Sequence, residues 1–373
     1  MIRIVPAQAD DDLAAAADLI RLYASTLAPH LGADGIAADA DDLPGPYAPP
    51  NGAIFLARVA GEPAGIVALK RLEDGSCALK RMFVRQEYRG RGVTKALVRR
   101  LLATASRMGC RRVRLGTVEE MTAARRLYER MGFRPIPPYQ SDPEDTLFYE
   151  RVLPPRPRIK ICCIMSEAEA GLALAAGADA LGLVSHMPSG PGVIDEERIA
   201  RIAVRVPEGV DSVLLTSLTE PGAIVAQHRR CGTTVIQLVD RLAPGAHEAL
   251  RRALPDVRLW QVIHVTGDAS VDEAMAAAPP VDALLLDSGN PSLAVKELGG
   301  TGRVHDWHVS RAIREQAGVP VYLAGGLDAS NAAEALDRVE PFGLDVCSGV
   351  RTSGRLDPEK LEAFMLAAAR LLP

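Results

Sequence analysis

The sequence lacks the features that mark several specialised classes of protein. It contains no run of about 18 apolar residues, so no membrane-spanning helix is expected. Its first residues do not place a basic segment before an apolar one, which argues against a secretory signal. Its net charge is only −4, whereas nucleic-acid binding usually needs a strongly basic face. These absences predict a cytoplasmic protein that binds neither membranes nor nucleic acids.

Cysteine is scarce and follows no recognisable spacing. The six cysteines form no CxxC pair and no regular framework. With 48% hydrophobic and 24% charged residues, the chain can build an ordinary globular core without crosslinks. We therefore expect the cysteines to be reduced, as in the cytoplasm. They are Cys77, Cys110, Cys162, Cys163, Cys231 and Cys347.

The chain of 373 residues is long enough for two domains, and a proline-rich segment predicts where they meet. Pro154, Pro155 and Pro157 cannot continue a helix or a central strand. Residues 1–154 hold 22 basic and 19 acidic residues, and the remainder holds 21 and 28. We predict an N-terminal domain at 1–152, a linker at 153–158 and a C-terminal domain at 159–373.

The N-terminal part has a mixed pattern of strands and helices. Short apolar runs are separated by turn residues, and two longer segments place apolar residues at helical spacing. This pattern predicts an α+β domain. The expected strands are 54–58, 65–69, 79–84 and 112–115, and the expected helices are 94–108 and 123–131.

The C-terminal part alternates strictly between short apolar runs and helix-like segments. Such alternation predicts parallel strands with helical crossovers. Eight repeats in about 215 residues fit a closed (β/α)₈ barrel, and no G-x-G-x-x-G follows the first run to suggest a dinucleotide-binding sheet. The runs are 159–163, 180–184, 212–215, 235–238, 259–265, 283–287, 321–324 and 343–347.

A basic glycine loop joins the third expected strand to the next helix. It reads Arg89-Gly90-Arg91-Gly92-Val93-Thr94. Backbone N–H groups at such a helix start can bind a pyrophosphate, and the two arginines would add positive charge. The alternative is a solvated basic turn with no ligand.

The N-terminal part resembles the GNAT N-acetyltransferases, whose loop reads Arg/Gln-x-x-Gly-x-Gly/Ala. A second match is the segment 123–133, which contains Tyr128. The resemblance implies acetyl-CoA with its pyrophosphate over residues 89–94, an amine acceptor of unknown identity, and Tyr128 as the acid that reprotonates the CoA thiolate. A half-buried aromatic side chain is the alternative for Tyr128. Ala78 and Gly116 stand where relatives often carry acidic residues, so no general base is identified.

Several chemically active residues follow the expected barrel strands, where barrel enzymes place their sites. Cys162 ends the first run and Asp287 the sixth, so a thiol and a carboxyl could move protons in opposite directions. Gly325-Gly326 and Ser348-Gly349 end the last two and offer N–H groups for a phosphate. A buried core thiol and a capping carboxylate are the alternatives.

The C-terminal part resembles phosphoribosylanthranilate isomerase, the TIM barrel enzyme of tryptophan biosynthesis that performs an Amadori rearrangement without a cofactor. The resemblance implies that Asp287 protonates the ribose ring oxygen and that Cys162 removes the C2′ proton. Lys160 is a basic neighbour whose side chain is expected to point away. The matching segments are 160–162, 177–182, 285–288, 299–302, 306–307, 323–327 and 345–350, and the implied phosphate site comprises Gly300, Gly302, Gly325, Gly326, Ser348 and Gly349.

The chain departs from this family at the aromatic end of the expected pocket. Gly192 stands where the family carries an arginine that pairs with the anthranilate carboxylate, Val239 replaces a histidine, and Cys163 replaces a glycine. Arg351, just after the phosphate loop, is a candidate replacement for the arginine. The alternatives are a barrel that isomerises another phosphosugar derivative, or a sensor in which the binding of CoA or a phosphosugar regulates a partner.

Overall fold

The computed structural model describes residues 2–27, 33–140, 146–289 and 304–369. These residues divide into two compact units, one within Met1–Arg156 and the other within Pro157–Ala368. The predicted limits at residues 152 and 159 stay predictions. No helix of the described ranges combines the length and the apolar character that crossing a membrane requires.

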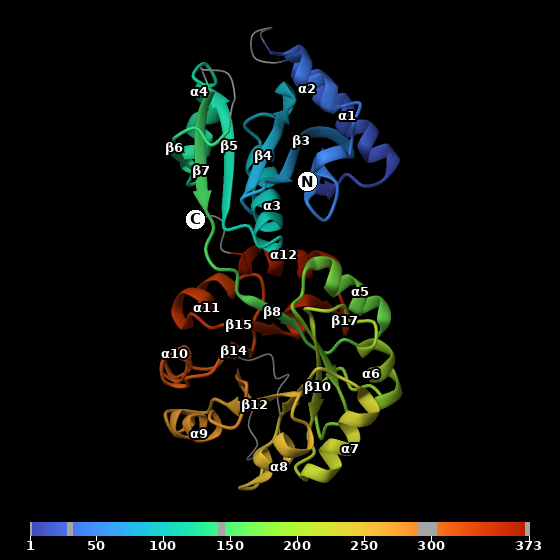
Figure 1. Ribbon diagram of the computed structural model, residues 1–373, viewed down its shortest axis with the longest axis vertical. Helices are drawn as coiled ribbons and strands as arrows, with labels where there is room; N and C mark the ends of the chain where they lie inside the picture. The colour runs from blue at the N-terminus through green and yellow to red at the C-terminus, as the bar shows by residue number, and fades with distance from the viewer. Residues whose placement is uncertain (1, 28–32, 141–145, 290–303, 370–373) are drawn as a thin grey trace. The chain divides into compact units, whose positions relative to one another are not determined.

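The N-terminal unit is built on a seven-stranded sheet with the order β1-β2-β3-β4-β5-β7-β6 (Figure 1). Neighbouring strands are antiparallel except β4 and β5, which pair in parallel. The strands are β1 (Ile2–Pro6), β2 (Gly52–Val59), β3 (Glu62–Arg71), β4 (Cys77–Val84), β5 (Arg112–Val118), β6 (Arg134–Ile136) and β7 (Thr146–Val152). The helices are α1 (Asp10–Ser25), α2 (Ala33–Asp39), α3 (Val93–Arg107) and α4 (Thr122–Arg130).

The central strands of this sheet are covered on both faces. On β3, Ile66 and Ala68 join a core with α1, whereas Gly65 faces Leu97 of α3 on the other side. Because side chains alternate along a strand, burial of both sets requires a layer of helix on each face. This explains the nearly continuous apolar run of β3, and it confirms the α+β arrangement predicted for this part of the chain.

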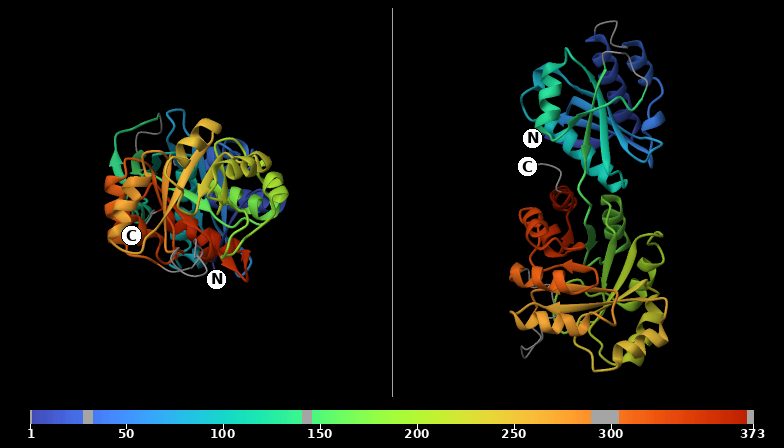
Figure 2. Two further views of the ribbon diagram at one scale, coloured as in Figure 1. Left: turned by 90° about the horizontal axis from the view of Figure 1, so that it is seen from below. Right: turned by 60° about the vertical axis from the view of Figure 1, so that its left-hand side comes forward.

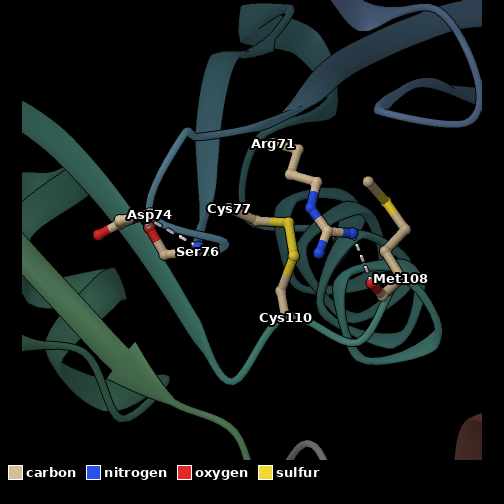
Figure 3. The surroundings of a disulfide bond; sticks show 6 residues. All are labelled: Arg71, Asp74, Ser76, Cys77, Met108 and Cys110. Carbon is tan, nitrogen blue, oxygen red and sulfur yellow. Dashed lines mark hydrogen bonds between the residues drawn. A yellow bond between two sulfur atoms is a disulfide. The ribbon is translucent and has the colours of Figure 1, made fainter.

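A disulfide joins Cys77 and Cys110 at one end of the sheet (Figure 3). Cys77 begins β4 and pairs in register with Val113 of β5, so Cys110 lies close by at a Cα–Cα distance of 6.0 Å. Nearby, Arg71 donates a hydrogen bond to the Met108 carbonyl oxygen (2.9 Å). The expectation of reduced cysteines is therefore wrong for this pair. Sequence spacing did not indicate it, because the two residues are 33 positions apart and meet only through the pairing of β4 with β5.

The C-terminal unit is a closed barrel of eight parallel strands, which confirms the predicted (β/α)₈ architecture. Figures 1 and 2 show its helices outside the ring of strands. The strands are β8 (Arg158–Ile161), β9 (Ala180–Val184), β10 (Asp211–Thr216), β11 (Val235–Leu238), β12 (Arg258–His264), β13 (Ala283–Asp287), β14 (Val321–Leu323) and β15 (Gly343–Val346). The helices are α5 (Glu167–Ala176), α6 (Glu196–Ala203), α7 (Pro221–Cys231), α8 (Ala246–Ala253), α9 (Ala269–Ala277), α10 (Trp307–Gln316), α11 (Ala332–Val339) and α12 (Pro358–Ala368).

The barrel strands separate two apolar cores. Leu259 and Ile263 of β12 pack outward beneath the helices, and Trp260 and Val262 of the same strand face the interior. Trp260 stacks on Tyr322 of β14 with ring centroids 4.5 Å apart, so aromatic side chains fill part of the interior. The residues after the strand ends are left to form a site.

Candidate active sites

A cavity opens where the barrel strands end, and it gathers residues from loops far apart in the sequence. It encloses about 680 Å³ together with its open mouth. Five of the predicted residues lie in its wall: Cys162, Asp287, Gly325, Gly326 and Ser348. The other lining residues are Cys163, Val184, Met187, Ser189, Gly190, Pro191, Leu215, Gln237, Val239, Ala324, Leu327, Asp345 and Cys347.

Cys162 follows β8 directly and is held by its own backbone. Its amide donates to the Val346 carbonyl oxygen (2.8 Å), which continues the β8–β15 ladder by one residue. The side chain is buried, with 6% exposed. A hydrogen bond from the Cys163 thiol lowers the pKa of Cys162, burial opposes this, and the positive charge of Lys160 lowers it further. The net lowering favours the thiolate, which is the form that can accept a proton.

The cation beside Cys162 is part of a buried ion pair. Lys160 is fully buried, and its Nζ lies 2.9 Å from Oδ1 of Asp345. Burial alone would lower the pKa of Lys160, but Asp345 and Cys162 outweigh it and raise the pKa, so the ammonium stays charged. The expectation that Lys160 points away from Cys162 is wrong, because residues two apart on a strand share a face.

Asp287 ends β13 and its carboxylate is partly exposed to the cavity. Its Oδ1 accepts a hydrogen bond from the Ser288 amide (2.7 Å). Asp287 therefore makes the local contact expected of a capping carboxylate. Its carboxyl also lines the same cavity as the Cys162 thiol. Its role as an acid stays a prediction.

The predicted phosphate floor is only partly within the described residues. Gly325 and Gly326 adopt φ values of 82° and 62°, a conformation that side chains disfavour. Asn331 fixes this turn by donating to the Gly326 carbonyl oxygen (2.9 Å). Gly349 does not line the cavity; it packs so tightly on the backbone of Leu327 that no Cβ fits there. Gly300 and Gly302 lie outside the described residues.

Cys163 occupies the space that a side chain at position 192 would need. Gly192 has a φ of 81°, and a Cβ built there would overlap the Cβ of Cys163 and lie 2.9 Å from its Cα. Cys163 itself has a φ of 60°, which is unusual for a residue other than glycine. Glycine at 192 and a side chain at 163 are thus two halves of one packing arrangement.

Arg351 does not replace the missing arginine. Its side chain is 6% exposed and its guanidinium lies against Glu169, with Nη1 3.1 Å from Oε1. It also donates to the carbonyl oxygens of Cys162 (3.2 Å) and Cys163. Arg351 is absent from the described cavity wall. The prediction that it compensates is wrong, because Arg351 is buried away from the cavity and its two Nη groups bind Glu169 and the turn behind the two cysteines.

The sequence argument missed Asp345, Cys347 and Gln237 as cavity residues. Asp345 and Cys347 are two residues apart at the end of β15, and Lys160 and Cys162 are two apart at the end of β8. Because residues two apart on a strand point to the same side, this spacing could have predicted that the members of each pair share a face. Gln237 of β11 is 3% exposed, and its side-chain oxygen has no hydrogen-bond partner among the described residues. A buried acceptor of this kind is suited to a ligand.

The second predicted site lies in the N-terminal unit, between β4 and α3. Gly90 and Gly92 have φ values of 74° and 84°, and Gly92 caps the start of α3. The first turn of α3 carries no acidic residue that would compete with an anion for its free amides and its partial positive charge. Arg89 donates to the Val84 carbonyl oxygen (3.0 Å), and the Arg91 guanidinium lies 5.8 Å from the centre of the Tyr88 ring. These contacts fix both arginines beside the loop.

The remaining predicted residues of this site differ in exposure. Val93 is buried and anchors the helix, while Thr94 is half-buried and keeps its amide in the first turn. Tyr128 of α4 is 6% exposed and packs against Phe133, with ring centroids 5.7 Å apart. Burial raises the pKa of Tyr128, so its phenol keeps its proton at neutral pH. Its role as an acid stays a prediction.

Comparisons with known proteins match both units. The family model described as N-(5'phosphoribosyl)anthranilate (PRA) isomerase matches residues 159–367, and the one described as Acetyltransferase (GNAT) family matches residues 19–133. The chain is 34% identical over 198 residues to N-(5'-phosphoribosyl)anthranilate isomerase of Methanocella arvoryzae, covering 53% of this chain and 91% of that protein. It is 36% identical over 215 residues to the protein of the same name from Halobacterium salinarum, covering 57% and 95%. The crystal structure of phosphoribosyl anthranilate isomerase from Thermus thermophilus is 28% identical with a TM-score of 0.48, covering 56% and 97%.

Proposed function

Because the chain belongs to the N-(5'-phosphoribosyl)anthranilate isomerase family, we propose that its barrel isomerises N-(5'-phosphoribosyl)anthranilate, a step of tryptophan biosynthesis. We propose further that its GNAT domain is an acetyl-CoA-dependent N-acetyltransferase, which makes the chain bifunctional. The observation that carries the isomerase proposal is the shared cavity, since a thiol with a lowered pKa and a carboxyl line one space beside the Gly325-Gly326 turn.

The two groups divide the proton transfers between them. Asp287 in its protonated form gives a proton to the ribose ring oxygen, and the ring opens to a Schiff base. Cys162 as thiolate then removes the C2′ proton, and the resulting enol becomes the ketone. Each transfer needs an acid or base within hydrogen-bond reach of the reacting atom. These proton transfers need neither a metal nor an organic cofactor.

The Lys160–Asp345 pair supports the base in this scheme. Its ammonium stabilises the thiolate of Cys162, and the Asp345 carboxylate keeps Lys160 charged and in place. A thiol that starts mainly protonated would be a poor base at neutral pH. The positive charge of Lys160 therefore adds to the larger effect of the Cys163 hydrogen bond in lowering the pKa of Cys162, while the charge of Asp345 opposes it.

The substrate's phosphate and aromatic ends would meet different parts of the wall. The amides after β14 and β15 suit the phosphate. None of the described lining residues is cationic, so the anthranilate carboxylate would be recognised by neutral donors of the wall. Neutral donors bind a carboxylate less strongly than a bidentate arginine, which predicts weaker substrate binding rather than loss of the reaction.

Rescue of a tryptophan auxotroph that lacks the isomerase tests the barrel proposal. The wild-type chain should restore growth, and Asp287→Asn should abolish it because the amide cannot supply the proton. Asp256→Asn is the matched control, since this aspartate is exposed on the surface outside the cavity. Failure of the folded, expressed wild-type chain, or growth of the Asp287→Asn strain, would contradict the proposal.

The N-terminal proposal rests on the glycine loop and on an opening in the sheet. β4 and β5 pair only through Cys77 with Val113 and Ala78 with Arg114, so the following backbone of β4 has no partner on β5. An extended amide-bearing arm such as that of CoA can add to such an edge while its pyrophosphate binds the start of α3. Acetyl-CoA should therefore raise the unfolding temperature of this unit, and no shift at saturating acetyl-CoA would count against the proposal.

A further inference from the structure

Three thiols meet at the rim of the barrel. Cys162 and Cys163 follow β8, Cys347 follows β15, and these two strands are neighbours in the barrel. All three line the cavity described above. Of the three, only Cys162 exchanges a proton with the substrate in the proposed isomerase chemistry; Cys163 lowers the pKa of Cys162, and no step uses Cys347.

Cys163 and Cys347 are already almost in bonding contact. The Cys347 thiol donates to the Cys163 sulfur at an Sγ–Sγ distance of 2.7 Å, about 0.7 Å longer than a disulfide bond. Cys163 is 5% exposed, whereas Cys347 is half-buried and is the most accessible thiol of the three. Bond formation requires only a small movement of two side chains.

We propose that Cys163 and Cys347 form a reversible oxidation site, at which a hydroperoxide that enters the cavity converts the two thiols into a disulfide. The Cys347 thiolate attacks one peroxide oxygen, the O–O bond breaks, and the departing oxygen leaves with the thiol proton as water or an alcohol. Cys163 then attacks the sulfenic sulfur of Cys347, the S–O bond breaks, and a second oxygen leaves as water with the Cys163 proton. Two thiols supply the two electrons that reduce one peroxide, and a dithiol reverses the change by exchange.

The disulfide alters the catalytic thiol without bonding to it. In the reduced protein the hydrogen bond from the Cys163 thiol is the largest cause of the lowered pKa of Cys162, and the same thiol lies 3.6 Å from the Pro191 carbonyl oxygen, its alternative acceptor. A disulfide has no S–H, so this support is lost and the pKa of Cys162 rises. A higher pKa lowers the fraction of Cys162 that is thiolate at a pH below that pKa. Oxidation would therefore switch off the base while sparing it from irreversible oxidation.

Peroxide titration of the full chain with mapping of the disulfides tests the proposal. Hydrogen peroxide should produce a crosslink between the peptides that contain Cys163 and Cys347, and dithiothreitol should remove it. Because Cys162 and Cys163 share a peptide, the mapping is repeated with Cys162→Ser, in which the crosslink should persist. Absence of the crosslink in the wild type, or its loss in Cys162→Ser, overturns the proposal whether or not the barrel is an isomerase.

Activity measurements then test the consequence, which rests on the proposed isomerase function. Each variant is compared with its own reduced form. Wild-type activity at neutral pH should fall on oxidation and recover with dithiothreitol, in line with the raised pKa of Cys162. Cys347→Ser should lose this recoverable component. Cys231→Ser is the control and should keep it, because Cys231 is buried at the end of α7 outside the cavity and burial raises its pKa to about 11. An equal recoverable loss in Cys347→Ser contradicts the assigned site.

Discussion

Replacing Gly192 with alanine tests the packing of Cys163 against position 192, where the family carries an arginine. The new Cβ would overlap the Cβ of Cys163, approach its Cα to 2.9 Å and lie 3.0 Å from its Sγ. The residue would also have to keep a φ of 81°, which an L side chain disfavours. Two separate costs are therefore expected, one from the backbone conformation and one from the clash.

The two costs have different sizes and can be separated. A left-handed conformation costs an alanine about 1 to 2 kcal/mol, and overpacking of a tight site costs about 1 to 3 kcal/mol. Gly209→Ala measures the first cost alone, because Gly209 has a φ of 86° with open space around its Cβ position. In a Cys163→Gly background the clash with the Cys163 side chain disappears. Gly192→Ala should therefore be less destabilising there by about 1 to 3 kcal/mol.

Urea unfolding followed by tryptophan fluorescence gives the required free energies of unfolding. Both tryptophans of the chain, Trp260 and Trp307, lie in the barrel unit, so the signal reports that unit alone. Strictly additive effects of Gly192→Ala and Cys163→Gly would refute the reasoning, as would equal costs for Gly192→Ala and Gly209→Ala.

Three further substitutions test the charge arrangement and the glycine loop. Lys160→Met should lower the free energy of unfolding of the barrel in urea by about 3 to 5 kcal/mol, because it leaves the buried Asp345 carboxylate unpaired. It should also move the acidic limb of the isomerase pH profile to higher pH, because the pKa of Cys162 rises. An unmoved limb would show that Lys160 does not lower the pKa of Cys162. Burial would raise the pKa of Glu169, but hydrogen bonds from Arg351 and two amides hold it below its ordinary value of 4.5. The free energy of unfolding should therefore decrease as the pH falls below about 4.5. Glu169→Gln should make this decrease smaller in acid titrations. Gly92→Ala should reduce the acetyl-CoA-induced rise in unfolding temperature, because φ there is 84°; an undiminished rise would mean that the loop does not hold the ligand.

The barrel could be predicted strand by strand because its signal is local. Each buried parallel strand is a short apolar run, and the structure shifts the expected bounds by no more than two residues, with the largest shift at the end of β8. The N-terminal unit was less predictable. The strand β1 and the helix α1 were not expected, because β1 is short and α1 buries mainly alanines and a few leucine and isoleucine side chains, which give a weak periodic pattern.

The site was predictable at the level of strand ends but not of contacts. Cys162 and Asp287 could be assigned to one rim because the carboxyl ends of parallel barrel strands share it. The direction of Lys160 and the partner of Arg351 depended on side-chain geometry, and there the expectations were wrong. The contact between Cys163 and Cys347 joins residues 184 positions apart, and no local pattern marks it.

The missing arginine therefore bears on recognition rather than on chemistry. The Cys163 side chain fills the volume that a side chain at position 192 would need. The two departures from the family pattern, cysteine at 163 and glycine at 192, are therefore coupled. Meanwhile the ion pair beneath Cys162 and the turn that Arg351 holds keep the catalytic thiol in place. Cys163 also touches the chemistry, because its thiol lowers the pKa of Cys162. We therefore expect Cys163→Gly to raise the pKa of Cys162 while leaving the proton transfers of Cys162 and Asp287 possible.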